Sequence, residues 1–253
     1  MTGPGTNTYL VGAAEVAVVD PGPDLAAHVE AILRAVAETG GRVATLLVTH
    51  AHADHLPAAF RLRDRTGAHL LAHRDVAQAD RSLADGDVVE VGGDRLTAYA
   101  TPGHAGEHLC FWIDADHLLF SGDLIAGAGT VVLEDAPGAL GRYLDSLRRV
   151  EALRPRTILP GHGPVVENGV EKVREYLVHR AERDRQIVDA LQDGPASVDT
   201  LVQRLYVDTP PALYPMAARN VRAHLERLES AGTVTVKDGQ FRLLPAAGPR
   251  SPR

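Results

Sequence analysis

The segment from His50 to His55 constrains this chain more than any other feature of its sequence. It reads H-A-H-A-D-H and directly follows an apolar run, Val43–Val48. Three imidazoles and one carboxylate within six residues, at the end of a predicted strand, are typical of a metal site, because these groups suit zinc, iron and manganese. The alternative is a polar loop with scattered histidines. With 12 His in 253 residues, chance gives such a string in roughly two chains per thousand, so we favour the metal site.

Three further ligand-type residues follow apolar stretches and lie beside glycine. They are His104 in T-P-G-H, Asp123 in S-G-D and His162 in P-G-H-G. In each case a short strand ends, a turn with glycine reverses the chain, and a ligand-type side chain is left at the strand's end. Loops held by a rigid sheet are where binding residues concentrate. Together with the first motif they offer seven ligand-type residues in four loops, enough for two metal ions.

These motifs, in this order and at this spacing, resemble the metallo-β-lactamase superfamily over about residues 5–162. The resemblance implies a dinuclear centre with two Zn²⁺ ions per chain. Carried over position by position, it assigns one ion to His50, His52 and His104, the other to Asp54, His55 and His162, and a bridging role to Asp123. Oxygen-reducing relatives carry Glu at the position of His52, so the resemblance favours hydrolysis over redox chemistry.

The chemistry implied by this resemblance is hydrolysis by a hydroxide held between two metal ions. Such ions lower the pKa of a shared water toward about 7. Asp54 and Asp123 are the predicted catalytic residues, since each can accept a hydrogen bond from the attacking water as well as bind metal. The single cysteine, Cys110, lies in the apolar string L-C-F-W-I, and we interpret it as a buried structural thiol.

Other residues are expected near the centre without binding metal. His108 follows His104 by four residues, and we expect it to support the site or the fold. Asp20 resembles a carboxylate that lies beside the metals, and Asn7 is expected to reach the site. His73 is equally compatible with the cleft and with packing.

The order of predicted elements indicates mixed α and β structure, and the resemblance implies a four-layer αββα sandwich. Residues 1–170 are expected to form this catalytic domain. Strands are predicted at residues 8–11, 15–19, 43–48, 69–72, 88–91, 95–100, 109–113 and 117–121. Helices are predicted at residues 24–38, with Asp24 as the cap, and at residues 57–65 and 141–153.

Residues 171–253 differ in character, because helical periodicity replaces the metal motifs. Helices are predicted at residues 171–191, 198–205 and 216–230, with Ser197 as the cap of the second. A hairpin is predicted at residues 233–243 around Lys237-Asp238-Gly239. Three helices and a hairpin predict a winged helix. The superfamily branch of the mitochondrial β-lactamase-like endoribonuclease and the fungal polyketide thioesterases carries such a domain here.

The same branch bears on the N-terminus, where G-T-N-T-Y-L resembles its opening strand. Branch members carry a further stretch ahead of this strand. Either this chain is a shortened variant or Met1 is an internal methionine.

The composition and the N-terminal sequence bear on the compartment and the source of the protein. A single cysteine excludes a disulfide framework. The sequence contains no run of 18 apolar residues, so we expect no membrane-spanning helix. The N-terminus lacks a basic start and an apolar signal core, so we expect a cytoplasmic protein. Basic residues are 24 Arg and 2 Lys, which favours a GC-rich bacterial coding sequence. The sequence is compatible with an oligomer but does not specify one.

A winged helix raises nucleic acid as a partner. The helix at residues 216–230 offers five candidate side chains: Arg219, Asn220, Arg222, His224 and Arg227. Residues 1–170 hold 13 basic and 22 acidic side chains, a balance of −9, and residues 171–253 hold 13 and 11, a balance of +2. Nucleic-acid readers are usually more basic, so we favour a solvated helix surface.

The predicted substrate is therefore a small-molecule ester or thioester. Single-stranded RNA is the alternative substrate, and a winged-helix regulator with a metal-sensing domain is a third interpretation. True β-lactamase activity is not expected, because the chain has no secretion signal and Asp123 occupies a bridging position that lactamases typically lack.

Overall fold

The computed structural model describes residues 5–245, which form two compact units. The first, the sandwich unit, runs up to Val131 and from Arg142 to Tyr176. The second, the C-terminal unit, comprises Val132–Gly141 and the chain from Leu177 onward. The domain boundary near residue 170 stays a prediction, and no sequence pattern indicated that residues 132–141 group with the C-terminal unit.

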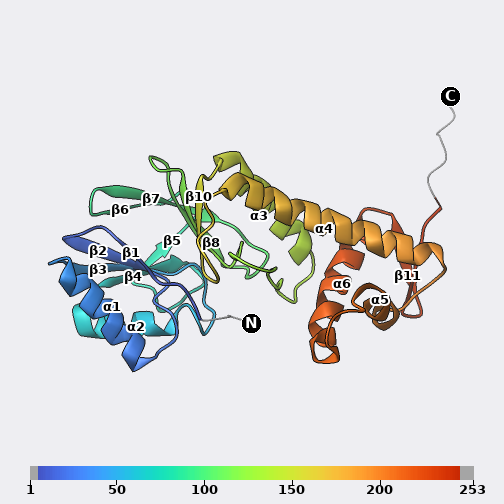
Figure 1. Cartoon of the computed structure of the whole chain (residues 1–253), viewed down its shortest axis with the longest axis horizontal. Coiled ribbons are helices and arrows are strands. Elements are labelled where there is room, and N and C mark those ends of the chain that lie inside the picture. Colours follow the sequence, from blue (N-terminus) through green and yellow to red (C-terminus); the bar gives the residue numbers. More distant parts are fainter. Residues whose placement is uncertain (1–4, 246–253) are drawn as a thin grey trace. The chain divides into compact units, whose positions relative to one another are not determined.

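The first sheet of the sandwich unit has five strands in the order β1-β2-β3-β4-β5. β1 pairs antiparallel with β2, and the remaining neighbours are parallel. Helices α1 and α2 connect parallel strands and lie together against one face of this sheet (Figure 1). The strands are Tyr9–Val11, Glu15–Val19, Arg42–Leu47, His69–His73 and Arg81–Leu83, and the helices are Ala26–Glu38 and Pro57–Thr66.

The second sheet has the strand order β10-β9-β8-β7-β6. β10 pairs parallel with β9, and the other neighbours are antiparallel. Its strands are Val88–Val91 (β6), Asp94–Ala100 (β7), Leu109–Ile113 (β8), Leu118–Gly122 (β9) and Thr157–Pro160 (β10). Helix α3 (Ala139–Leu153) connects β9 to β10 and lies along the end of β7, where the Arg149 guanidinium sits 4.8 Å from the centre of the Tyr99 ring.

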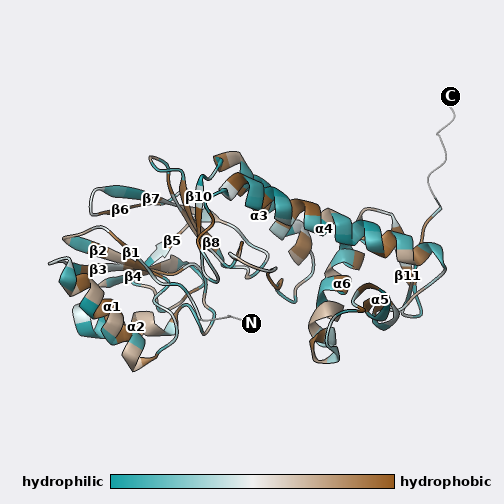
Figure 2. Cartoon of the chain, in the orientation of Figure 1, coloured by the Kyte–Doolittle hydropathy of each residue, from teal (hydrophilic) through white to brown (hydrophobic). Residues whose placement is uncertain are grey.

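The two sheets pack face to face through a layer of buried hydrophobic side chains. Val19 and Leu47 of the first sheet share one buried cluster with Leu96, Phe111 and other residues of the second. Figure 2 shows the brown, hydrophobic residues of these strands. A second cluster joins the first sheet to α1 and α2. With α3 beside the second sheet, the layers are helix, sheet, sheet and helix, and the expected αββα sandwich is confirmed.

The strand directions place four loops at one edge of the sandwich. β7, β9 and β10 run in the same direction, so their carboxyl ends meet at the same edge. The loop after β3 joins them there, because Leu109 N donates to Thr49 O at 2.8 Å. Ligand sites of open α/β sheets lie at the carboxyl ends of strands, and this edge carries the predicted metal motifs.

Two sequence-based expectations in this unit need correction. Asp24 does not cap α1, whose N-cap is Leu25 without a side-chain hydrogen bond. The Asp24 carboxylate instead accepts hydrogen bonds of 2.5 and 2.9 Å from Arg61, because a charge-assisted pair of bonds is stronger than a cap. β5 was not predicted either, because its three residues are too few for a periodic signal.

The C-terminal unit is the expected winged helix. It contains the part of α4 (Gly169–Gln192) from Leu177 onward. The elements that follow are α5 (Val198–Leu205), a 3₁₀ turn (Pro211–Leu213), α6 (Tyr214–Ser230), β11 (Val234–Lys237) and β12 (Gln240–Leu243). Ser197 caps α5 as predicted, accepting from Thr200 N at 3.2 Å. Asp238 and Gly239 have φ of 50° and 73°, the left-handed pair of a tight hairpin turn. Among the described residues, no helix is long and apolar enough to span a membrane.

Candidate metal centre

All seven predicted ligands are brought together at the edge described above. His50, His52, Asp54 and His55 lie between β3 and α2, and the others follow the ends of β7, β9 and β10. Three overlapping groups have ligand atoms within 4.8 Å of one another: His50, His52 and His104; His50, His55 and Asp123; Asp54, His55 and His162.

The first half of the centre consists of three imidazoles. His52 Nδ1 lies 2.9 Å from His50 Nε2 and 3.0 Å from His104 Nε2. Nitrogen ligands of a tetrahedral zinc ion, each about 2.1 Å from the metal, lie about 3.4 Å apart. Three ring nitrogens that face one another cannot all be satisfied by mutual hydrogen bonds, whereas one cation accepts all three. This half therefore has the chemistry of a metal site.

The second half combines imidazoles with a carboxylate. Asp54 Oδ2 lies 3.2 Å from His162 Nε2 and 3.8 Å from His55 Nε2. The Asp54 side chain is 32% exposed, whereas that of His55 is fully buried. Asp54 is therefore the ligand-type group of this half that water reaches most easily.

Asp123 reaches both halves. Its Oδ2 lies 3.4 Å from His104 Nε2 and 3.4 Å from His162 Nε2, and its Oδ1 lies 3.5 Å from His55 Nε2. Burial acts to raise the pKa of Asp123, but its contacts with His162 and His55 hold it well below the usual range. The group is therefore an anion between cationic or metal partners.

Two buried atoms of the centre lack hydrogen-bond partners in the described part of the chain. They are His55 Nε2 and Asp123 Oδ1. A buried polar atom without a partner costs about 1–3 kcal/mol, so native proteins rarely leave one without a reason. Both atoms point into the group of ligand atoms, and a metal ion would satisfy both. The residues present thus fit a metal centre.

Asp20 and Thr49 orient one histidine in each half. Asp20 Oδ2 accepts from Thr49 Oγ1 at 2.8 Å and from His55 Nδ1 at 2.9 Å. Because the Thr49 hydroxyl donates to Asp20, it accepts from His50 Nδ1 at 3.0 Å. Both histidines therefore carry hydrogen on Nδ1 and present Nε2 to the centre, the usual arrangement behind metal-binding histidines.

The charge state of His55 follows from the same contacts. Without a bound metal ion, burial acts to lower the pKa of His55, but the carboxylates of Asp20 and Asp123 outweigh burial and raise it to about 10. A metal ion bound at His55 Nε2 would displace the proton from that nitrogen. Asp20 itself adopts φ of 49°, a left-handed conformation that is costly outside glycine and that turns its side chain toward Thr49 at the end of β2. The expectation that Asp20 lies beside the metal ligands agrees with this geometry.

His108 supports the Asp123 loop. Asp123 N donates to His108 Nε2 at 3.1 Å, and His108 Nδ1 bonds Thr101 Oγ1 at 2.8 Å. Burial lowers the pKa of His108 to about 3, so the ring stays neutral and accepts this bond. Gly122 has φ of 47°, and a Cβ there would lie 2.7 Å from His108 Nε2, so glycine permits the close approach.

Asn7, His73 and Glu107 belong to none of the three ligand groups formed by the described residues. Asn7 contacts the loop around His162 and not a ligand atom. His73 accepts from Asp75 N at 3.3 Å and belongs to none of the three groups formed by the described residues. Glu107 accepts from Ala51 N at 3.1 Å and was not predicted, because no local pattern links positions so distant in the chain.

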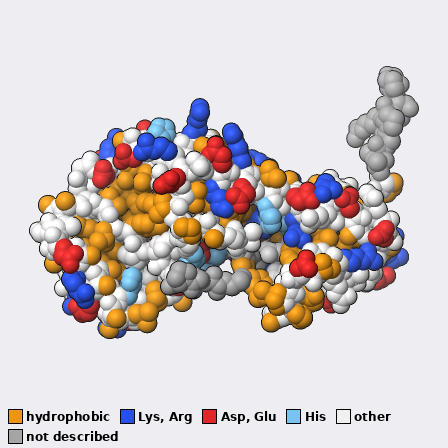
Figure 3. Space-filling view, in the orientation of Figure 1, with side chains coloured by type: hydrophobic (Ala, Val, Ile, Leu, Met, Phe, Trp, Pro, Cys, Tyr) orange, Lys and Arg blue, Asp and Glu red, His pale blue; other side chains and the backbone are white. Residues whose placement is uncertain are grey.

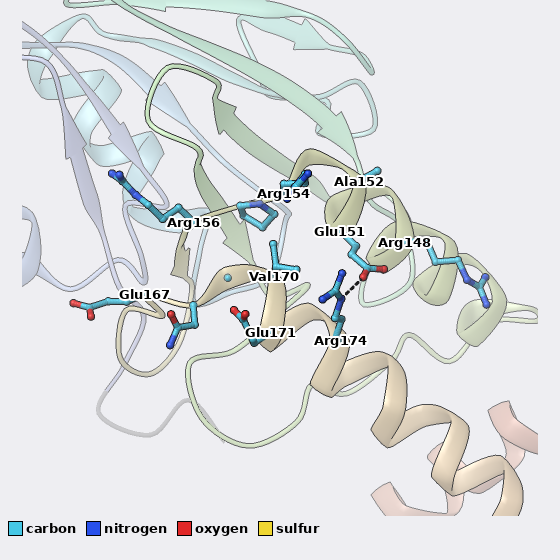
Figure 4. Close-up of a pocket in the computed structure, with 12 residues that line it drawn as sticks. Arg148, Glu151, Ala152, Arg154, Arg156, Glu167, Val170, Glu171 and Arg174 are labelled. Atoms are coloured by element: carbon cyan, nitrogen blue, oxygen red, sulfur yellow. Dashed lines mark hydrogen bonds and ion pairs between the residues drawn. The ribbon is translucent and has the colours of Figure 1, made fainter.

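A separate open hollow of about 740 Å³ lies between the end of α3 and the start of α4 (Figure 4). Its charged lining consists of four arginines and three glutamates, and Arg174 Nε bonds Glu151 Oε1 at 2.6 Å. It contains no histidine, aspartate or cysteine among the described residues that line it. The hollow therefore lacks the imidazoles that hold the metal centre together, and the metal centre remains the candidate site.

Most of the charged α6 candidates for nucleic acid make contacts within the C-terminal unit. Arg219 donates to Leu133 O at 3.3 Å. Arg227 pairs with Asp184, and the buried His224 holds the same carboxylate at 2.7 Å. On the face seen in Figure 3, basic and acidic side chains alternate over this unit. Nucleic-acid binding stays a prediction.

Protein-family models match both the N-terminal and the C-terminal part of this chain. The metallo-β-lactamase superfamily model matches residues 1–162. The chain belongs to the metallo-β-lactamase superfamily. The model of the β-lactamase-associated winged helix domain matches residues 197–242, which agrees with the predicted winged helix. The superfamily match confirms the predicted class of enzyme, a hydrolase with the metallo-β-lactamase fold.

Individual relatives extend the comparison. The chain is 35% identical to the β-lactamase-like protein 2 homolog of Caenorhabditis elegans, over 91% of this chain and 80% of that protein. It is 36% identical to the atrochrysone carboxyl ACP thioesterase of Aspergillus fumigatus, over 75% of this chain and 60% of that protein. A solved metallo-β-lactamase family protein from Thermus thermophilus has a TM-score of 0.79 over 94% of both chains at 24% identity, a similarity of fold.

Proposed function

We propose that this chain is a dinuclear zinc hydrolase acting on a small-molecule thioester or ester. The observation that carries the proposal is the position of Asp123, whose oxygens lie 3.4–3.5 Å from histidines of both halves. His50, His52 and His104 would hold one ion, and Asp54, His55 and His162 the other.

Zinc is proposed from the donor set. Five imidazoles and two carboxylates without a thiolate suit zinc, and also iron or manganese. Hydrolysis needs no change of oxidation state, which favours zinc among the three. Burial lowers the pKa of His50 well below its ordinary value, so this ring is neutral at neutral pH and its Nε2 can bind metal.

Two bound metal ions would supply Lewis acidity and lower the pKa of a shared water toward about 7. The chain's own residues do the positioning. Asp54 is the more exposed carboxylate, at 32% against 12% for Asp123, and so is placed to accept a hydrogen bond from an incoming water. Asp123, held through its backbone N by His108, keeps the two halves in register.

A cysteine mechanism is not supported. Cys110 is fully buried in β8, and burial raises the pKa of its thiol to about 12. A thiol at that position is neither ionised nor accessible at neutral pH, and nucleophilic cysteines need a thiolate. The metal centre is therefore the source of the nucleophile in this proposal.

A thioester is the favoured substrate class because of the thioesterase relative, which is 36% identical over 75% of this chain. A hydrolase of this design attacks the carbonyl carbon and releases a thiol and a carboxylate. The chain spans only 60% of that relative, so its particular substrate is not carried over.

The test is a substrate comparison on the zinc-loaded full chain. Acyl-thioesters of several chain lengths, simple esters and labelled single-stranded RNA are offered at equal concentration. We expect thioester hydrolysis that a chelator abolishes and added zinc restores. RNA cleavage without thioester hydrolysis would overturn the substrate class, and inactivity of the zinc-loaded protein on all three would overturn the proposed function.

A further inference from the structure

The loop that carries His162 is held by the first described residues of the chain. Asn7 Nδ2 donates to Pro160 O at 2.9 Å and to Gly163 O at 2.8 Å. Asn7 N also donates to Gly161 O at 2.7 Å. One asparagine thus binds carbonyls on both sides of His162 and fixes the path of the backbone through it.

The same segment determines which nitrogen of His162 faces the centre. His162 Nδ1 lies 3.0 Å from Gly5 O. A carbonyl oxygen only accepts, so Nδ1 carries the hydrogen and Nε2 presents its lone pair to the centre. The contact with Gly5 therefore sets the tautomer that metal binding requires.

A further contact reaches the other accessible ligand of this half. Thr6 Oγ1 lies 3.4 Å from Asp54 Oδ2, at the long end of a hydrogen bond. Among the described residues, the hydrogen bonds of residues 5–7 to ligand side chains involve His162 and Asp54 of the second half. In the first half, His50 bonds Thr49 and His52, which come from the loop after β3.

The His162 loop is closely packed on the other ligands. A Cβ added at Gly161 would lie 2.6 Å from Asp123 Oδ1 and 2.7 Å from His55 Cε1, so the loop backbone packs directly on two of them. Metal–ligand distances tolerate only about 0.2 Å. A small shift of this loop would therefore alter ligand positions in the second half.

We propose that residues 5–7 are a positioning segment for the second metal ion, with Asn7 as its main positioning residue. Residues 5–7 control whether the Asp54–His55–His162 half retains its ion, while the His50–His52–His104 half binds independently of them. This inference rests on the proposed dinuclear function and adds a residue and a role to it.

The test compares Asn7→Asp with Leu10→Ala in the full chain. Asn7→Asp keeps the side-chain shape but replaces two N–H donors with a carboxylate oxygen that faces two carbonyl oxygens. Leu10 lies on the neighbouring strand with a 37% exposed residue surface and serves as the matched control. Zinc per chain is measured by elemental analysis after equilibration against a competing chelator, and the metal-free proteins are compared by thermal unfolding.

We expect wild type and Leu10→Ala to keep two zinc ions and Asn7→Asp to keep one, with affinity for the second ion weakened about 10- to 100-fold. Asn7→Ala should fall between them. Equal retention of two ions in Asn7→Asp would overturn this inference alone. Loss of both ions together would also overturn it, because the effect would not be confined to one half. Absence of zinc from the wild type would overturn the proposed function as well.

Discussion

Asp123 joins the two halves of the centre because its two oxygens face histidines on both sides. We expect Asp123→Ala to remove this link, so that one ion is lost or bound loosely. Thioester hydrolysis should fall by several orders of magnitude while circular dichroism shows an intact fold. Asp145→Ala, which removes an exposed carboxylate from α3, is the control and should keep wild-type activity. Near-normal turnover in a folded Asp123→Ala protein would show that the bridging assignment is wrong.

Cys110 provides a second test at the residue scale. Its thiol is buried and its pKa is raised to about 12, so it takes no part in catalysis. We expect Cys110→Ala to keep turnover within a few-fold of wild type and to lose some stability, because removing buried atoms leaves a small cavity. Turnover and urea unfolding check this. A large loss of turnover at unchanged stability and zinc content would indicate a chemical role for the thiol.

The seven ligand-type residues could be predicted from the sequence because each lies in a short local motif at the end of an apolar run. The residues that orient them could be predicted only in part. Asp20 was found through a resemblance, whereas Thr49 and Glu107 act through contacts with residues distant in the chain. Asn7 was expected at the centre and instead binds the backbone around His162, a contact across 153 positions that no local pattern encodes.

At the scale of elements, strands and helices with a clear apolar period were predicted within a residue or two. β8 and α5 match the expectation, because β8 is apolar throughout and α5 begins at a serine cap. β5 was missed because its pairing with β4 comes from the fold rather than from its own three residues. The cap proposed at Asp24 was wrong because Arg61 of another helix competes for the carboxylate.

The pairing of α6 with α4 predicts a pH dependence of stability. His224 on α6 holds Asp184 of α4 at 2.7 Å. Burial lowers the pKa of His224, opposed by Asp184, while Arg180 and Arg183 lower it further. Since the unfolded chain has the ordinary value near 6.5, it binds more protons than the folded chain below that pH, and stability therefore falls as pH falls through 6.5.

The check is urea unfolding of wild type and His224→Gln at several pH values from 5 to 8. We expect the stability of wild type to fall relative to that of His224→Gln below pH 6.5, by at most about 1.4 kcal/mol per pH unit, and the offset between the two proteins to be constant above it. The comparison is made within each variant across pH, so that a uniform loss of stability in His224→Gln does not affect it. Parallel pH dependences in the two proteins would show that His224 is not the source.

At the scale of the whole molecule, the two structural units do not coincide with the two sequence regions, residues 1–170 and 171–253. Residues 132–141 group with the C-terminal unit, in which Arg219 of α6 donates to Leu133 O across 86 positions. Arg219 and Arg227 are held by Leu133, Asp135 and Asp184, so α6 offers fewer free charges to a phosphate backbone than its sequence suggested. This supports a small-molecule substrate over RNA.

The proposed function requires two metal ions, held on either side of Asp123, for hydrolysis. The most direct measurement is a zinc titration of the metal-free full chain, with the ions counted by native mass spectrometry and thioester hydrolysis recorded at each addition. We predict that activity is absent without metal and approaches its maximum as the second ion binds. Full hydrolysis in the metal-free protein, or a maximum reached with one ion bound, would contradict the account.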